Sequence, residues 1–404
     1  MKIVADENIP HVVECFSSIG QVEAVSGRKI TPKAVADADI LLVRSVTQVG
    51  QDLLADSKVK FVATATIGFD HVDVDFLRRR NIGFASAPGS NANSAAEYVV
   101  AALLEVGQRH NITLEGKSIG VVGVGNVGSR VAKKCTALGM KVKLNDPPLR
   151  RQSGDPKYLP MDELFDCDFI TLHTPLTFEG IDGTFHLADE RFFKSLKTGG
   201  VFINASRGGV VDSTALQLAI KAGRLTAVVL DVWENEPNID VELMEMVDIA
   251  TPHIAGYSLD GKIAGMIMIY RDACEYFGLQ LKYEIGDFLP EPAVRQLTIS
   301  PRGKPEQQVL HQAVNEIYRI TADDRKLRHI LEEKAEQKGA FFDGLRKNYP
   351  VRREFQNTGV LIATEGTEEK ENVDSRLRGN DRAKVKTIVR KLAGIGFKVA
   401  DEQK

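Results

Sequence analysis

Residues 119–128 read Ile-Gly-Val-Val-Gly-Val-Gly-Asn-Val-Gly, and this stretch decides the fold of the chain. Its apolar start predicts a strand at 119–122, and the glycines that follow predict a tight loop. A helix is expected from about 129 to 138, where Gly139 ends it, and then a second strand at 141–144. Strand, loop, helix and strand fit within about 30 residues, as a dinucleotide-binding βαβ unit requires.

A glycine-rich loop that opens a helix can bind a pyrophosphate, because backbone N–H groups and the helix dipole both face the anion. Glycines also make ordinary turns, so the prediction depends on the place of this loop between strand and helix. Asp146 ends the next strand, where its carboxylate can accept hydrogen bonds from the adenosine ribose and repel a 2′-phosphate. We therefore expect NAD rather than NADP. The predicted cofactor contacts at the loop are Gly123, Gly125, Asn126, Val127 and Gly128.

Other apolar runs predict two parallel sheets. One sheet would continue the βαβ unit with strands at 169–172, 201–204, 227–230 and 249–250. Runs earlier in the chain alternate with helical spacings and predict a second sheet flanked by helices, with strands at 3–5, 40–43 and 61–63. Between these two groups, Ser94-Ala95-Ala96-Glu97 has the capping-box pattern and predicts the start of a long helix that reaches about residue 108.

We predict an α/β protein with two Rossmann-like, doubly wound parallel-sheet domains and a smaller α+β C-terminal domain. A helix at 262–277 is expected to return the chain to the first sheet, which makes that domain discontinuous. The predicted boundaries are 1–93 and 257–285 for a flavodoxin-like substrate-binding domain, 94–256 for an NAD-binding Rossmann domain, and 286–404 for the C-terminal domain.

The C-terminal region begins with a proline-marked linker and becomes rich in charge. Its predicted elements are a helix at 307–320, a strand at 359–363, a helix at 384–392 and a strand at 397–399. Residues 365–382 combine many charges with few apolar side chains, which predicts a mobile or disordered insert. The second half of this insert looks like a peptide translated from a bacterial intergenic repeat.

Composition excludes several classes of protein. With 404 residues and a hydrophobic fraction of 43%, the chain is long enough for two or three globular cores. A net charge of −3 gives no basic footprint for nucleic acid. The four cysteines are scattered, so neither a metal site nor a disulfide framework is expected. No signal peptide or membrane span is visible, and we expect a cytoplasmic protein.

Arg207 is the first candidate catalytic residue. It follows the predicted strand at 201–204 and precedes two glycines, at the edge of the sheet where ligands bind in open α/β folds. Its planar, permanently charged guanidinium suits bidentate recognition of a carboxylate and would polarise a keto oxygen. A surface salt bridge is the alternative, and the residues described next favour a functional role.

His253 follows another predicted strand and stands between two apolar residues. A histidine can accept the proton of a hydroxyl and later return it. His173 also ends a strand and is the main competitor, although Thr174 after it favours a loop shaped around the nicotinamide. A carboxylate paired with the histidine would hold its tautomer. Glu234 and Glu236 are both candidates, and spacing alone does not separate them.

Polar side chains also follow two strands of the first domain. Arg44 and Ser45 come after the strand at 40–43, and Thr66 lies just beyond the strand at 61–63. A cation and hydroxyls at strand ends suit a phosphate or carboxylate, whereas an ordinary capping network is the alternative. We predict that these three residues bind substrate.

The glycine loop, Asp146, Arg207, the stretch 231–237 and His253 occur in the same order as the motifs of the D-2-hydroxyacid dehydrogenases, and residues 1–285 resemble that family. The resemblance implies an NAD-dependent oxidoreductase in which His253 is the acid/base, Glu236 pairs with it and Arg207 binds substrate. It also implies cofactor contacts by Asp146, Thr174, Ala205, Ser206, Arg207, Asp231 and Gly256.

A closer resemblance is to members of this family that carry an additional C-terminal dimerisation domain. It implies a homodimer formed through residues 286–404, a phosphorylated 2-hydroxy acid as substrate, and substrate contacts by Ser45, Thr66 and Tyr257.

Two alternatives remain at this stage. A family member acting on 3-phosphoglycerate would carry a ligand-binding regulatory tail, which the predicted strand-helix-strand ending could mimic; Arg44-Ser45 and the motif at 346–349 favour a different sugar acid. A non-catalytic NAD-sensing scaffold or corepressor could share the fold. The presence of arginine, glutamate and histidine together favours an enzyme.

Overall fold

The computed structural model describes residues 1–363 and 379–399, which form two compact units. Unit 1 consists of Met1–Asn93 and Tyr257–Glu291, and unit 2 of Ser94–Gly256 and Pro292–Lys404. Each unit contains a doubly wound parallel sheet, and a smaller third sheet belongs to the C-terminal part of unit 2. The predicted α/β fold class with two doubly wound parallel sheets is therefore confirmed, and the unit that holds the first sheet is discontinuous in sequence.

Unit 1 is built on a five-stranded parallel sheet in the order β2-β1-β3-β4-β5. Its strands are β1 (Lys2–Asp6), β2 (Gln21–Val25), β3 (Ile40–Val43), β4 (Phe61–Thr64) and β5 (Gly83–Ala85). The predictions of β1, β3 and β4 are confirmed. The two edge strands were missed because β2 is largely exposed and β5 only half-buried, so neither has a continuous apolar run. The strand order reverses between β1 and β3, which makes this a topological switch point.

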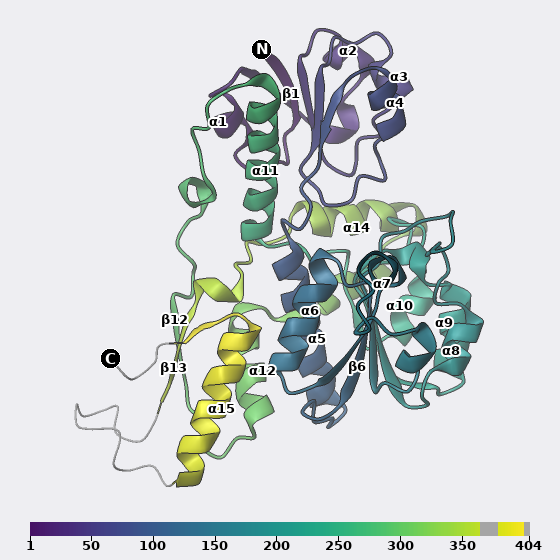
Figure 1. Cartoon of the computed structure of the whole chain (residues 1–404), viewed down its shortest axis with the longest axis vertical. Helices are drawn as coiled ribbons and strands as arrows, with labels where there is room; N and C mark the ends of the chain where they lie inside the picture. The colour runs from purple at the N-terminus through teal and green to yellow at the C-terminus, as the bar shows by residue number, and fades with distance from the viewer. Residues whose placement is uncertain (364–378, 400–404) are drawn as a thin grey trace, which may run out of the picture. The chain divides into compact units, whose positions relative to one another are not determined.

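Helices cover both faces of this sheet (Figure 1). They are α1 (Val12–Phe16), α2 (Pro32–Val35), α3 (Gln51–Leu54), α4 (Val74–Arg79) and α11 (Leu259–Phe277). On one face α11 buries Ile263, Met266 and Tyr270 against residues of β1, β3 and β4. On the other face, Leu53 and Leu77 pack with the opposite side chains of the same strands. The predicted return of the chain at 262–277 is thus confirmed, and α11 starts three residues earlier.

Unit 2 contains a six-stranded parallel sheet in the order β11-β10-β9-β8-β6-β7. Its strands are β6 (Ser118–Val122), β7 (Lys141–Asn145), β8 (Phe169–Leu172), β9 (Gly200–Asn204), β10 (Leu225–Leu230) and β11 (Ile249–Ala250). All six were predicted. Five of them are largely buried, which explains why each stands out as an apolar run; β7 is half-buried.

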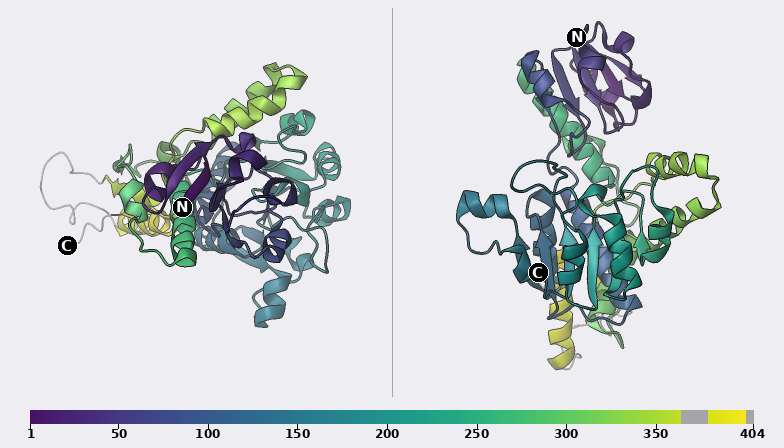
Figure 2. Two further views of the ribbon diagram at one scale, coloured as in Figure 1. Left: turned by 90° about the horizontal axis from the view of Figure 1, so that it is seen from above. Right: turned by 90° about the vertical axis from the view of Figure 1, so that its right-hand side faces the viewer.

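Helices also cover both faces of the second sheet (Figures 1 and 2). The covering helices are α5 (Ala92–Arg109), α6 (Asn126–Ala137), α8 (Glu190–Ser195), α9 (Ser213–Lys221) and α10 (Val241–Met246), whereas α7 (Pro147–Ser153) buries no residue. Phe192, Leu216 and Leu243, one from each of α8, α9 and α10, are buried in one core with the strands. No helix in the described part of the chain is long and apolar enough to span a membrane.

The C-terminal part of unit 2 forms a small parallel sheet with flanking helices. Its elements are β12 (Gln296–Ile299), α12 (Glu306–Ile317), α13 (Ile320–Arg328), α14 (Lys338–Lys347), β13 (Gly359–Ile362), α15 (Gly379–Ile395) and β14 (Lys398–Val399). The predicted helix at 307–320 is wrong at its end. Helix α12 ends at Ile317, because Tyr318 has an extended backbone conformation and its ring is buried. Helix α13 starts two residues after Tyr318. Residues 365–378 of the predicted insert at 365–382 lie outside the described residues. Its last four positions, 379–382, belong to α15, which begins at Gly379.

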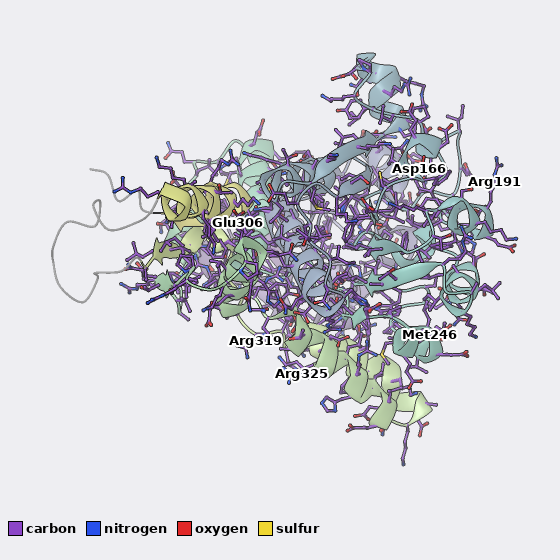
Figure 3. The ribbon with its side chains drawn as sticks, turned by 90° about the horizontal axis from the view of Figure 1, so that it is seen from below. Asp166, Arg191, Met246, Glu306, Arg319 and Arg325 are labelled. Atoms are coloured by element: carbon purple, nitrogen blue, oxygen red, sulfur yellow. The ribbon has the colours of Figure 1, made fainter. Side chains whose placement is uncertain are left out.

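This C-terminal part packs on the rest of unit 2. Phe342 of α14 is fully buried in the same core as α8, α9 and α10. Helix α15 lies against α6, where Lys134 Nζ donates to Ile395 O at 2.6 Å. It also lies beside α12, where Lys391 Nζ donates to Glu306 Oε2 at 3.0 Å; Figure 3 labels Glu306 next to this helix. The C-terminal part therefore contributes a side chain to the core of unit 2 and covers α6 with α15.

The predicted capping box at Ser94–Glu97 is wrong, and its two polar residues bind the C-terminal part instead. Because α5 starts at Ala92, Ser94 lies inside its first turn rather than at the N-cap. Ser94 Oγ donates to Glu354 Oε1 at 2.7 Å, and the buried Glu97 carboxylate accepts a hydrogen bond from Phe355 N at 3.1 Å.

Candidate active site

The candidate site residues of unit 2 follow the carboxyl ends of its six strands. Because parallel strands end at the same edge of a sheet, the order of strands also orders these residues in space. Along the sheet they are His253 after β11, Glu236 after β10, Arg207 after β9, Thr174 after β8, the glycine loop after β6 and Asp146 after β7. The three candidate catalytic residues thus follow three adjacent strands.

His253 and Glu236 form a hydrogen-bonded pair. His253 Nδ1 lies 2.7 Å from Glu236 Oε2, and the other carboxylate oxygen accepts from Trp233 N at 2.9 Å. Glu236 is the carboxylate that pairs with His253, a choice that spacing left open. Because the ionised carboxylate accepts a hydrogen bond from Nδ1–H, it favours the tautomer whose basic nitrogen is Nε2, and Nε2 points away from Glu236.

The ionised state of Glu236 follows from its surroundings. Burial works to raise the pKa of this carboxyl, but the charge and hydrogen bond of His253 and the nearby Arg346 guanidinium outweigh it. The pKa of Glu236 is therefore held below its usual range. The Glu236 carboxyl group is therefore ionised at neutral pH.

The backbone at His253 is in the left-handed region, with φ of 56°. A residue other than glycine adopts this conformation only when its surroundings hold it there. Asp231 supplies this support: its backbone oxygen accepts from His253 N at 2.6 Å, and its carboxylate accepts from Ile254 N and Ala255 N at 2.8 Å each. Thr251 Oγ1 donates to the same carboxylate at 2.6 Å.

The other candidates for acid/base chemistry are placed differently. Glu234 lies 2.7 Å from His186 Nε2, so it belongs to a separate pair. Burial lowers the pKa of His173 to about 3, and its Nδ1 atom is buried with no hydrogen-bond partner in the described part of the chain. A histidine that stays neutral at physiological pH is a poor general acid. His253 is the better candidate.

Arg207 lies on a loop that Asn204 shapes. The Asn204 carboxamide accepts from Ser206 N and Oγ and donates to Arg207 O at 3.0 Å. The half-buried Arg207 donates through Nη1 to Ser206 O at 2.8 Å. Gly208 then passes so close to Trp233 that a Cβ atom would lie 1.9 Å from the Trp233 carbonyl oxygen. The loop of Arg207 therefore packs on the loop that carries Glu236.

The glycine loop has the shape that a dinucleotide requires. At Gly128 a Cβ would lie 1.9 Å from Gly123 O, and Gly123 itself has φ of 83°, so both positions need glycine. At Gly125 a Cβ would meet nothing within 4 Å, so the outer side of the loop is open. Beside Gly123, Thr174 Oγ1 is buried and makes no hydrogen bond within residues 1–363 and 379–399. These residues fit a bound NAD.

The remaining predicted cofactor residues surround this loop. Asn126 and Val127 form the first turn of α6, where Asn126 is exposed. Asp146 caps α7 by accepting from Leu149 N at 2.9 Å, and it accepts from Val124 N in the glycine loop at 2.8 Å. Ala205 and Gly256 are both half-buried at strand ends.

The predicted substrate residues lie in unit 1. Arg44 and Ser45 follow β3 at the switch point, and Ser45 is exposed. Thr66 follows β4, where its hydroxyl bonds to Thr64 Oγ1 at 2.7 Å and to Gly68 O at 2.9 Å. Tyr257 precedes α11 and stacks with Lys262, whose Nζ lies 4.6 Å from the ring centroid.

Sequence reasoning missed two residues that build the site. Asn204 shapes the Arg207 loop, and Thr251 links the Asp231 carboxylate to Tyr98 through hydrogen bonds of 2.6 and 2.7 Å. Each is a polar residue in or next to an apolar strand, and this is the signal that could have identified them. The described residues contain no cluster of three or more histidine, cysteine, aspartate or glutamate side chains that could hold a metal ion.

Comparisons with known proteins show the family of the chain. The sequence model described as "D-isomer specific 2-hydroxyacid dehydrogenase, NAD binding domain" matches residues 92–255, and a "domain of unknown function" matches residues 288–374. The erythronate-4-phosphate dehydrogenase of Hahella chejuensis is 44% identical over 90% of this chain and 94% of its own length. The chain belongs to the erythronate-4-phosphate dehydrogenases. The one from Cronobacter sakazakii is 46% identical over 89% of this chain and 94% of its own length.

Solved structures match this erythronate-4-phosphate dehydrogenase family member over a shorter part of the chain. The D-lactate dehydrogenase of Aquifex aeolicus, complexed with NAD and lactic acid, is 25% identical, with a TM-score of 0.58 over 69% of this chain and 96% of its own. The NAD⁺-bound 3-phosphoglycerate dehydrogenase of Entamoeba histolytica is also 25% identical, with a TM-score of 0.59 over 72% and 99%. The chain is an NAD-binding oxidoreductase of the D-2-hydroxyacid dehydrogenase type.

Proposed function

We propose that this chain oxidises 4-phospho-D-erythronate at C2 to (R)-3-hydroxy-2-oxo-4-phosphooxybutanoate, a step in the biosynthesis of pyridoxal 5′-phosphate. The observation that carries the proposal is the His253–Glu236 pair, with a 2.7 Å hydrogen bond, at strand ends next to the loop of Arg207. A base, its carboxylate partner and a carboxylate-binding cation are the groups that oxidation of a 2-hydroxy acid needs.

Each catalytic residue has one role in this reaction. His253 Nε2 takes the proton of the C2 hydroxyl, and Glu236 stabilises the imidazolium that forms. Arg207 binds the substrate carboxylate and the C2 oxygen, which becomes the keto oxygen. Bound NAD⁺ supplies the acceptor for the hydride that leaves C2. The residues that would hold it are the glycine loop, Asp146, Thr174, residues 205–207, Asp231 and Gly256.

Unit 1 supplies the binding groups for the distal phosphate. Arg44 and Ser45 follow β3, which borders the switch point where ligands of open α/β sheets bind, and Thr66 follows the neighbouring strand β4. A guanidinium and two hydroxyls match the charge and the hydrogen-bond acceptors of a phosphate monoester. Tyr257, at the start of the return into unit 1, completes the proposed substrate contacts.

The substrate is tested by kinetics of the purified full chain with NAD. We expect reduced nicotinamide to form with 4-phospho-D-erythronate at a kcat/KM about 100-fold above that of unphosphorylated D-erythronate, because a site built for the phosphate would be left with unpaired polar groups. A 2-oxo acid acceptor is added in a second series, in case cofactor copurifies. Preference for 3-phosphoglycerate would establish the other dehydrogenase activity, and NAD binding without turnover of any acid would establish a sensing scaffold.

Selection of NAD over NADP is attributed to the Asp146 carboxylate. Since this side chain also caps α7, serine is the informative replacement: it retains a capping oxygen and removes the charge. For Asp146→Ser we expect the ratio of kcat/KM with NAD to kcat/KM with NADP to fall about tenfold or more, because repulsion of the 2′-phosphate is lost. Asp212→Ser, at the N-cap of α9, is the matched control and should leave the ratio unchanged.

We also propose that the enzyme is a cytoplasmic homodimer formed through residues 286–404. Within this region, residues 288–374 match a sequence model separate from that of the NAD-binding domain. The region exposes Val351 at 73% and Leu331 at 42%, apolar side chains that a partner subunit would cover. The four cysteines are buried free thiols, as is usual in a reducing compartment.

A further inference from the structure

Arg352, in the C-terminal part of unit 2, binds the loop that carries His253. Its Nη2 atom donates to Ala255 O at 2.7 Å and to Ser94 O at 3.3 Å. The side chain is only 6% exposed, so these are interactions of a buried cation. Hydrogen bonds from a charged donor are stronger than neutral ones, and removing such a donor leaves buried carbonyl oxygens unpaired.

The segment around Arg352 is itself fixed in position. The Arg352 guanidinium lies over the buried Tyr318 ring, 4.2 Å from its centroid. Two residues later Glu354 accepts the hydrogen bond from Ser94, and the next residue, Phe355, donates through its backbone N to Glu97. Arg352 therefore has little freedom to move relative to the first turns of α5, and it acts on Ala255 as a rigid support.

The loop 253–255 is held from two directions. Asp231 binds its three backbone N–H groups, and Arg352 binds the last of its carbonyl groups. The left-handed backbone of His253 is strained, and these contacts from both sides help to hold it in place. If the Arg352 contact is lost, the loop can relax, and the imidazole is then free to move away from the 2.7 Å contact with Glu236.

We propose that Arg352 is a positioning residue for catalysis, which sets the backbone of the His253 loop from the C-terminal part of the chain. The proposal rests on the proposed function of the same site. It assigns to the region beyond the shared dehydrogenase fold a part in the chemical step, in addition to subunit association.

The test compares Arg352→Met and Arg352→Lys with the parent full-length enzyme. Because a shift of about 1 Å in a catalytic group costs about 100-fold, we expect kcat of Arg352→Met to fall about 100-fold while KM and the Kd for NAD change by less than about threefold. Lysine keeps the charge but lacks the planar fork, so kcat of Arg352→Lys should fall about tenfold. Hydrogen–deuterium exchange at the amides of 253–256 should become faster in both variants.

Arg328→Met is the matched control. Arg328 also lies in the C-terminal part and donates to backbone carbonyls of unit 2, at Met244 (3.2 Å) and Val247 (2.8 Å), but not in the His253 loop. Its replacement should lower the melting temperature and leave both kcat and amide exchange at 253–256 at parent values. A role of Arg352 in stability alone would make the Arg352 variants behave in the same way as this control.

Two results would overturn the proposal: a folded Arg352→Met enzyme with kcat within about twofold of the parent, or parent-like exchange at 253–256. If Arg352→Met does not fold, Arg352→Lys decides by the same two criteria. The exchange measurement needs no substrate, so it still tests Arg352 if the parent enzyme is inactive on every 2-hydroxy acid, a result that would count against the proposed function alone.

Discussion

Replacement of His253 by glutamine is expected to lower kcat roughly 10²- to 10⁴-fold, the range by which a general acid/base contributes. Glutamine has nearly the size of histidine and can still donate a hydrogen bond to Glu236, but it cannot take up a proton. The fall should therefore be in kcat, with KM and the affinity for NAD close to parent values. Steady-state kinetics measure kcat and KM, and equilibrium binding measures the affinity for NAD.

The chain contains a matched control for this experiment. His186 forms the same kind of pair with Glu234, at 2.7 Å, and its backbone is also left-handed, with φ of 51°. If the His253–Glu236 pair acted only by stabilising the fold of unit 2, His186→Gln would lower kcat as much as His253→Gln. We expect it to keep kcat within about threefold. Near-normal turnover by His253→Gln would exclude the proposed mechanism.

Replacement of Arg207 by methionine is expected to lower kcat/KM with 4-phospho-D-erythronate by roughly 10²- to 10³-fold. Loss of one partner from a desolvated, hydrogen-bonded charge pair costs about 2–5 kcal/mol, because the substrate carboxylate remains without its cation. Arg207→Lys restores the charge but not the bidentate geometry, so it should recover only part of the loss.

In the Arg207→Met enzyme, kcat is expected to fall and KM to rise. Arg207 binds the substrate carboxylate in the ground state, and it binds the C2 oxygen as this becomes a keto group. Arg224→Met serves as the control. Arg224 donates to the backbone oxygens of Phe193, Lys194 and Leu196, which is a structural role in the same unit. An Arg207→Met enzyme whose kcat/KM stays within about threefold of the parent would refute carboxylate binding by this residue.

The sequence predicted β1, β3 and β4 of the first sheet and all six strands of the second, because buried parallel strands are continuous apolar runs. It also predicted which loops carry candidate residues, because strand ends are a local feature. Local sequence could not determine whether Glu234 or Glu236 pairs with His253. Both follow β10 within a few residues, and the path of the loop between them decides which one meets the histidine after the neighbouring strand.

The predictions that failed also depend on tertiary surroundings, which a local sequence pattern does not show. Ser94 and Glu97 match a capping box locally, but their hydrogen-bonding groups are taken by Glu354 and Phe355, more than two hundred residues later in the sequence. Edge strand β2 was missed because it is largely exposed and lacks the apolar run of a central strand. The catalytic and binding roles of the site residues remain predictions that the experiments above test.

The interleaved cores also bear on the order in which the chain becomes folded during synthesis. Unit 1 needs α11, which reaches the ribosome exit only after the whole stretch 94–256 has been made, a delay of roughly 10–30 s at bacterial elongation rates. Unit 2 in turn lacks Phe342 and the partners of Ser94 and Glu97 until the last quarter of the chain emerges. Neither unit can complete its core until these later segments are made, so we expect apolar strands of both units to stay accessible to chaperones during much of translation.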